Sequence, residues 1–236
     1  MKKILFPIVF VVAFCFYVSG ASATGIELVG LVSDTGTGFG NVSNILTLQN
    51  PSFPDNTEIG SVSWSTSGDV LSGDATNTSN TWLFSAIIAK GIASASDLGI
   101  VYNVNQQGNL GGLTTTLNSF TLQVFNNSTG AQVFTTDSCV GCGTGFVPEA
   151  QGTGGAGYLF DLDAATEAAL AQFFTNPSDF RLGGTGSVSL ANDGPENFFF
   201  AKISSVTPVP EPGTMLLLGF GLVGLAAVGR RKFKTL

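Results

Sequence analysis

The stretch FTLQVFNNSTGAQVFT, residues 120–135, decides the fold class of this chain. Apolar and polar side chains alternate from Phe120 to Phe125, which is the period of a strand with one buried face. A second strand-like run, Gln132 to Thr135, follows a polar connection that ends at Gly130. Longer hairpin loops commonly contain glycine, so this stretch predicts a β-hairpin.

The same pattern extends over most of the chain on both sides of this hairpin. Short β-branched and aromatic runs are separated by connections rich in Gly, Ser, Thr and Asn, as in all-β proteins. No alternation of strands with long helices is present, so a doubly wound fold is not expected. The further strands that we predict are Ile26–Val32, Ile45–Leu48, Ile59–Trp64, Trp82–Ile88, Leu98–Val104, Gly157–Leu162, Phe180–Leu182, Val188–Leu190 and Phe198–Ile203.

One segment, Ala164 to Phe174, is rich in helix-forming residues. Asp163 is placed to cap its first turn, and Asn176-Pro177 ends it. Leu170, together with Phe173 or Phe174, is expected to face the core. The sequence therefore predicts a mainly β ectodomain over residues 24–207, a β-sandwich or jelly roll with one short helix.

The first residues have the organisation of a secretory signal peptide, predicted as a helix over residues 1–23. A basic start is followed by the apolar run Ile4–Val18, and Ala21 and Ala23 place small residues at the positions that a signal peptidase accepts. Cleavage is expected after Ala23. The alternative is an N-terminal anchor helix that is retained, but the run is short for a membrane span.

The last residues contain a second apolar run, 213–229, at the lower length limit of a membrane-spanning helix. Arg230, Arg231 and Lys232 follow it directly within the basic tail 230–236, and basic residues stay on the cytoplasmic side. We therefore predict a single-pass inner-membrane protein with its ectodomain outside. The alternative for 213–229 is a buried core helix.

Three prolines lie between the ectodomain and this apolar run, at Pro208, Pro210 and Pro212. Proline lacks a backbone N–H and favours extended structure, so the residues after Ile203 are expected to leave the sheet as a spacer. The tail, 208–236, is similar to the PEP-CTERM sorting tails of Gram-negative bacteria in the order of its three parts. These parts are the Pro210-Glu211-Pro212 motif, the apolar run and the basic cluster.

That resemblance implies processing by exosortase, a membrane-embedded cysteine transpeptidase. It further implies that Pro210, Glu211 and Pro212 are recognition residues on a substrate, and that the severed ectodomain passes to the cell surface or the extracellular polymer. The alternative for the motif is a plain juxtamembrane linker. Such tails occur on very different ectodomains, so the resemblance implies no ectodomain activity.

Charge and composition exclude several classes of function. Between residues 24 and 207 three basic residues stand against fifteen acidic ones, which leaves a formal charge of −12 and argues against nucleic-acid binding. The chain has no histidine, so neither a His-dependent triad nor a His-ligated zinc or haem site can form. We expect no enzymatic activity and no metal site built on histidine.

Two features of the ectodomain are candidates for chemistry. Cys139 and Cys142 are the only cysteines after the signal peptide, and in the oxidising periplasm we expect a disulfide, with a redox-active pair as the alternative. The carboxylates Asp161, Asp163 and Glu167 resemble a Ca²⁺-binding set, but they lack the spacing of a calcium loop. No cofactor is predicted beyond this weak indication of Ca²⁺.

Three hypotheses describe the ectodomain. The leading one is a structural or interaction role at the cell surface or in the extracellular matrix. The second is a carbohydrate-binding module for exopolysaccharide, with Trp64, Tyr102 and Tyr158 as candidate glycan contacts and Trp82 expected in the core. The third is a glycan hydrolase or lyase built on paired carboxylates.

Overall fold

The computed structural model describes residues 25–33, 43–50, 57–105, 114–147, 156–191, 194–205 and 207–208. All of the predicted ectodomain strands lie in these ranges. The predicted signal peptide, the Pro210-Glu211-Pro212 motif, the apolar run 213–229 and the basic tail lie outside the described residues.

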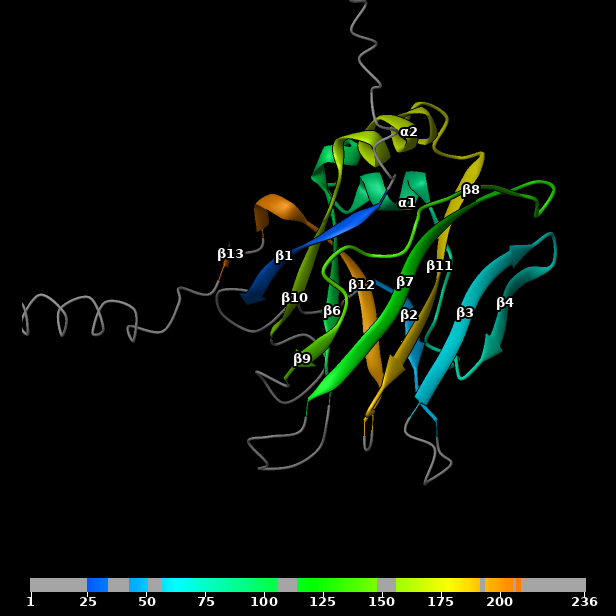
Figure 1. Ribbon diagram of the computed structural model, residues 1–236. Helices are drawn as coiled ribbons and strands as arrows, with labels where there is room; N and C mark the ends of the chain where they lie inside the picture. Colours follow the sequence, from blue (N-terminus) through cyan, green and yellow to red (C-terminus); the bar gives the residue numbers. More distant parts are fainter. Residues whose placement is uncertain are drawn as a thin grey trace, which may run out of the picture.

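Two antiparallel sheets form the domain, as predicted for a mainly β fold (Figure 1). The first sheet, called sheet 1, has the order β13-β1-β10-β6-β12-β2. Its strands are β1 (Ile26–Ser33), β2 (Ser43–Leu48), β6 (Leu98–Asn103), β10 (Ala156–Leu162), β12 (Glu196–Lys202) and β13 (Thr207–Pro208).

Sheet 2 has the order β4-β3-β11-β7-β8, and two short strands, β5 and β9, pair with β11 and β7. The predicted hairpin of residues 120–135 is confirmed, since β7 pairs with β8 in antiparallel register. The strands of sheet 2 are β3 (Thr57–Ser65), β4 (Gly68–Gly73), β5 (Trp82–Leu83), β7 (Thr115–Asn126), β8 (Gln132–Thr135), β9 (Thr144–Phe146) and β11 (Phe180–Ser189).

Stacked aromatic rings join the two sheets. Phe120 of β7 stacks on Phe198 of β12 with ring centroids 4.3 Å apart, and Phe198 stacks in turn on Tyr102 of β6 at 4.8 Å. All three side chains are buried. Because Phe120 belongs to sheet 2 and the other two to sheet 1, the inner faces of both sheets share one core, which is the packing of a β-sandwich.

Sheet 1 is also apolar on its outer face. A second buried cluster consists of Val32, Val101, Leu159 and Phe199, with Ala201 packed against it. Every residue of β6 is consequently buried. This two-sided burial explains why the runs in β6 and β12 are continuously apolar rather than alternating.

Two helices cover one end of the sandwich, at the top of Figure 1. The predicted helix is confirmed as α2 (Ala164–Thr175), which is capped by Asp163 and buries Leu170 and Phe173. The second helix, α1 (Phe84–Ala89), was not predicted, and Phe84 packs edge-on against Phe174 of α2 with centroids 5.0 Å apart. Two 3₁₀ turns, η1 (Ala95–Asp97) and η2 (Ile203–Ser205), complete the described elements.

The predicted strand Trp82–Ile88 is therefore wrong for most of its length. Only Trp82 and Leu83 are extended, and the helix begins at Phe84. Phe84 and Ile87 are three residues apart and both buried, so the helical period places both on the inward face of α1. Apolar runs this short do not separate strand from helix by pattern alone.

A second difference concerns the predicted strands Phe180–Leu182 and Val188–Leu190. They are one strand, β11, which continues through the glycine-rich segment between them and ends before Leu190, where φ is 63°. At Gly183 a Cβ atom would lie 2.5 Å from the carbonyl oxygen of Val62 on the neighbouring strand. Gly183 therefore permits a close approach of β3 and does not mark a turn.

Candidate functional site

The last described residues of the chain, in β13, lie at one edge of sheet 1. β13 pairs with β1, placing Thr207 opposite Ser33 and Pro208 opposite Val32. The expectation that the chain leaves the sheet directly after Ile203 is therefore wrong, because a proline is tolerated on an edge strand.

Cys139 and Cys142 form a disulfide, with their Cα atoms 5.6 Å apart. The bridged loop is held by backbone hydrogen bonds to both sheets. Cys139 N donates to the Phe120 carbonyl of β7 at 3.2 Å, and Val140 N donates to the Ile26 carbonyl of β1 at 2.7 Å. This position, between strands of the two sheets, suits a structural crosslink.

The structure does not bring the three candidate glycan contacts together. Tyr102 lies in the core, where its hydroxyl hydrogen-bonds to Thr115 Oγ1 at 3.0 Å and burial raises its pKa well above the ordinary value. The prediction of a glycan contact at Tyr102 is therefore wrong, because the ring has no exposed surface. It shares the inner face of β6 with Leu98 and Ile100, which belong to the same core cluster.

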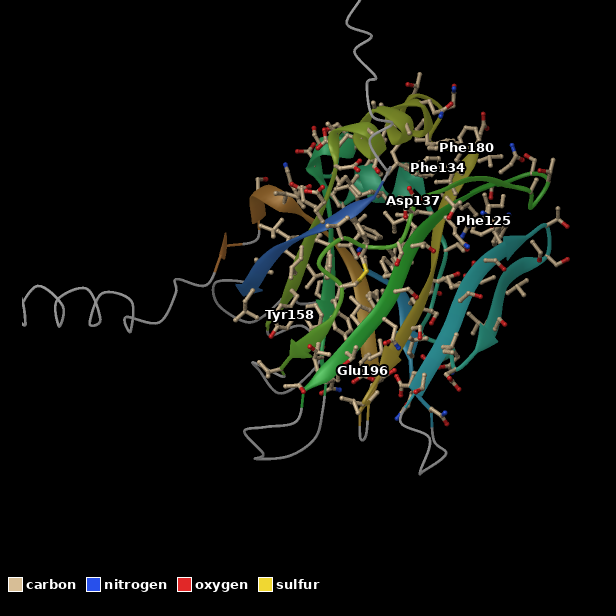
Figure 2. All side chains as sticks on the ribbon, viewed as in Figure 1. Phe125, Phe134, Asp137, Tyr158, Phe180 and Glu196 are labelled. Carbon is tan, nitrogen blue, oxygen red and sulfur yellow. A yellow bond between two sulfur atoms is a disulfide. The ribbon has the colours of Figure 1, made fainter. Side chains whose placement is uncertain are left out.

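Tyr158 and Trp64 lie on different sheets and are half-buried. The Tyr158 hydroxyl accepts a hydrogen bond from Val147 N at 3.0 Å, and its ring packs edge-on against Phe146 with centroids 4.7 Å apart. Figure 2 shows Tyr158 on the β10 side of the molecule. Trp64, on β3, donates its indole N–H to the Asn127 carbonyl at 2.8 Å. These side chains do not form one binding platform.

A pocket of about 340 Å³ lies beside the other tryptophan, Trp82. The indole N–H of Trp82 donates to the Asn44 carbonyl at 2.7 Å, and its ring meets the ring of Phe200 edge-on with centroids 5.2 Å apart. These contacts hold the ring at the boundary between core and solvent. The lining residues come from β4, β5, α1, β11 and the chain before β5: Asp69, Asn80, Thr81, Trp82, Leu83, Ala86 and Arg181.

Arg181 is the cationic wall of this pocket. Its guanidinium carbon lies 3.8 Å from the ring centroid of Trp64, a stacked cation–π contact. Nε donates to Thr81 Oγ1 at 2.8 Å and Nη2 to the Thr81 carbonyl at 3.0 Å. Burial lowers the pKa of Arg181 and the nearby Asp69 carboxylate partly opposes this effect, but the guanidinium stays charged at neutral pH.

Thr81 connects Arg181 to the acidic member of the pocket. Its hydroxyl donates to Asp69 Oδ1 while accepting from Arg181 Nε, and its backbone N–H also donates to Asp69 Oδ1 at 3.2 Å. Lys90, at the end of α1, places its ammonium 5.1 Å from the Trp82 ring centroid. The pocket therefore combines fixed donors, a carboxylate and an indole surface. The sequence analysis did not single out this set.

A pair of buried carboxyl groups is the second feature that the sequence analysis missed. Glu58 of β3 and Glu196 of β12 are 2% and 0% exposed, and their side chains are in hydrogen-bond contact. Burial raises the pKa of Glu58, although hydrogen bonds from Glu196 and from Asn50 N act in the opposite direction. Figure 2 shows Glu196 at the end of the sandwich away from the helices. This burial leaves no space for a sugar between the two acids, so this pair does not serve glycoside hydrolysis.

Strand parity is the signal that could have located this pair. Glu58 has the same parity as Gly60 and Val62, which point into the core, and Glu196 has the same parity as Phe198 and Phe200. An acidic residue that alternates with inward-facing apolar residues along a strand is predicted to point its carboxyl group into the core.

No group of three or more His, Cys, Asp or Glu side chains that could hold a metal ion occurs within the described ranges. Two of the three carboxylates considered for Ca²⁺, Asp161 and Asp163, accept backbone N–H groups. Asp163 Oδ1 accepts from Thr166 N at 2.6 Å and Oδ2 from Gly25 N at 2.9 Å, while Asp161 Oδ1 accepts from Leu162 N at 2.7 Å.

Among the residues with described positions, no helix has the length and apolar character needed to span a membrane. The residues assigned to signal cleavage, sorting and topology all lie outside the described residues, so their geometry is not part of the structure. These residues are Ala21, Ala23, Pro210, Glu211, Pro212, Arg230, Arg231 and Lys232.

Comparison with known proteins gives a match for the tail and none for the domain. Neither a curated protein nor a solved structure matches the chain. One family model does match, and it covers the segment that begins at β13: the chain carries a PEP-CTERM protein-sorting motif over residues 208–232.

Proposed function

We propose that the protein is a non-enzymatic surface or matrix protein of a Gram-negative bacterium, exported and then sorted by exosortase through its PEP-CTERM tail. The observation that carries this proposal is the sorting motif, 208–232, which overlaps the folded domain at Pro208 of β13. The domain and its sorting signal are thus joined without an intervening module. Processing would release a compact sandwich with its tail site at one sheet edge.

Two observations support a role without catalysis. The chain contains no histidine, which removes the commonest general base. The close carboxyl pair, Glu58 and Glu196, is sealed within the core. The domain is then a module that is placed at the surface and acts by contact.

Fractionation of the producing bacterium tests the sorting step. Deletion of residues 215–236 should leave the domain in the periplasm, and Glu211→Gln should slow processing, so that the unprocessed precursor accumulates in the membrane. Glu167→Gln is the matched control, since it makes the same chemical change on α2 of the folded domain. Unchanged distribution of the deletion variant between membrane, periplasm and surface fractions would refute the proposal.

Polysaccharide binding is the second candidate function, and the Trp82 pocket is the observation that favours it. Sugar sites combine an aromatic surface with fixed hydrogen-bonding groups, and this pocket has Trp82 beside Asp69, Asn80 and Arg181. Co-sedimentation of the full-length chain with purified extracellular polymers tests it. Retention that is lost in Trp82→Ala but kept in Val133→Ala, a change of an exposed side chain on β8 that does not line the pocket, would support binding at this pocket, and no retention on any polymer would count against it.

A further inference from the structure

The pocket beside Trp82 gathers residue types that are rare in this chain. The protein has two tryptophans, and one lines the pocket while the other stacks on its arginine. Arg181 and Lys90 are two of only three basic residues between residues 24 and 207. Such convergence in a strongly acidic domain marks a site where an anion would be attracted rather than repelled.

Arg181 keeps donors available after its contacts within the protein are counted. A guanidinium has five N–H groups, and two of them donate to Thr81. Within the described part of the chain, the remaining three donate to no acceptor. They lie on Nη1 and Nη2 and form the end of the guanidinium, whose parallel N–H bonds match a carboxylate in bidentate fashion.

Acceptors for hydroxyl groups lie in the same pocket. Asp69 uses Oδ1 for both contacts with Thr81, and Asn80 uses its amide nitrogen to donate to the Thr78 carbonyl at 2.7 Å. Asp69 Oδ2 and the Asn80 side-chain oxygen accept no hydrogen bond from the residues that the structure describes. Donors for a carboxylate, acceptors for hydroxyls and an indole surface together match one kind of ligand.

We propose that this pocket binds an acidic sugar unit, with its carboxylate on Arg181 and its hydroxyls on Asp69 and Asn80. This inference refines the second candidate function, polysaccharide binding, and is independent of how the tail is sorted. The apolar face of the sugar ring lies against the surface formed by Trp82, Leu83 and Ala86. A volume of about 340 Å³ holds one or two sugar rings rather than a long chain segment.

The site is held in place before a ligand arrives. Arg181 is fixed by its stack on Trp64 and by both hydrogen bonds to Thr81, and Trp82 is fixed by Asn44 and Phe200. Side chains that are already ordered lose little conformational entropy on binding, which favours affinity in a small site. Lys90 adds a second positive charge beside Trp82 without entering the core.

The test uses the full-length chain in detergent micelles, titrated with trigalacturonate and with its carboxyl-reduced neutral counterpart. Intrinsic fluorescence is the readout, because both tryptophans lie at the pocket. We expect trigalacturonate to bind about tenfold more tightly than the reduced sugar, and we expect this difference to shrink as salt is added. Equal affinity for the two probes, or no fluorescence response to either at millimolar concentration, would overturn the proposal.

Variants assign the response to the pocket. Arg181→Gln should weaken trigalacturonate binding about tenfold, and Lys90→Gln, on an exposed side chain, about threefold. Lys202→Gln removes the third basic residue, which does not line the pocket, and should leave affinity unchanged. If Lys90→Gln and Lys202→Gln weaken binding equally, the attraction is non-specific and the assignment to this pocket is refuted. The sorting experiment reads cell fractions only, so either proposal can fail without the other.

Discussion

Glu58 and Glu196 meet inside the core, one from each sheet, with their side chains in hydrogen-bond contact. Two carboxyl groups make such a contact when one of them holds a proton. Burial is the main cause of the raised pKa of Glu58, and the carboxylate of Asp74 adds to it. Burial therefore favours the protonated form of Glu58, at the end of the sandwich opposite the helices (Figure 2).

The pH dependence of stability follows from this contact. The folded chain keeps a proton on Glu58 over a pH range in which the unfolded chain loses it, so the free energy of unfolding falls as pH rises from the ordinary pKa of 4.5 to the raised one. Above the raised pKa, Glu58 is ionised in both the folded and the unfolded chain, so its contribution to the free energy of unfolding no longer changes with pH. Denaturant titrations between pH 4 and pH 8 should show this decline in the wild type.

Glu58→Gln should remove most of this decline, because an amide at this position does not titrate. Its carbonyl oxygen still accepts from Asn50 N. At pH 8 we expect the variant to exceed the wild type by about 1–2 kcal/mol in free energy of unfolding. A variant less stable than wild type at pH 8, or a wild type whose stability does not change with pH, would contradict a raised pKa of Glu58.

The helix cap at Asp163 also ties the first described residue to the fold. Asp163→Ala removes acceptors for Thr166 N and Gly25 N and should cost about 1–2 kcal/mol, whereas Asp163→Asn should cost less because asparagine is an equally good cap. Thermal unfolding of the three proteins gives this ranking. Equal losses of stability in both variants would mean that the charge of the carboxylate, and not its hydrogen bonds as a cap, stabilises this helix end.

Acid should weaken the same cap. Burial tends to raise the pKa of Asp163, but the hydrogen bonds from Thr166, Gly25 and Ala165 outweigh it and the pKa lies below its ordinary value. The contribution is therefore complete above the unfolded pKa and is lost as pH falls through the folded one. The difference between wild type and Asp163→Ala should shrink in acid, and a constant difference down to about pH 2 would argue against this assignment.

Phe198 is the centre of the three-ring stack that joins the sheets. Phe198→Ala should cost about 3–5 kcal/mol, because it removes buried area and leaves a cavity between Phe120 and Tyr102. Val133→Ala is the control, since this side chain on β8 is 47% exposed and should change stability by less than about 0.5 kcal/mol. Similar losses for both variants in chemical denaturation would refute a core centred on Phe198.

The disulfide closes a very short loop, so its entropic contribution is modest. Cys139 and Cys142 are separated by three in sequence number, and for a loop this short the loop-closure relation gives about 2 kcal/mol. A reductant, or the double change Cys139→Ser with Cys142→Ser, should lower the melting temperature by about 4–8 °C and leave the β-sheet content intact. An unchanged melting temperature on reduction would show that the bridge does not constrain the unfolded chain.

Local pattern predicted most elements of the domain. The hairpin at 120–135, the capped helix after Asp163 and most strands rest on signals contained within a few neighbouring residues. The errors occurred where tertiary packing decides between local alternatives. Phe84 is helical because it packs on α2, and β11 continues through its glycines because β3 and β7 lie on both sides of it.

The candidate ligand site could not be predicted in the same way. Thr81 and Arg181 are 100 residues apart in sequence, and Trp64 comes from yet another strand. Tyr102 was expected at the surface as an aromatic glycan contact, yet it stacks in the core on Phe198. Residue type alone does not report burial, and parity does not report it in β6 either, because both faces of this strand are buried.

By itself, the sequence determined the sorting signal, the β class and the acidic character of the domain, because contiguous residues and simple periods carry these properties. Only the tertiary structure decided that Arg181 stacks on Trp64 beside the Trp82 pocket, and that Glu58 meets Glu196. Both arrangements depend on which strands become neighbours across long stretches of chain. That choice is made by the packing of two whole sheets, and no short segment contains it.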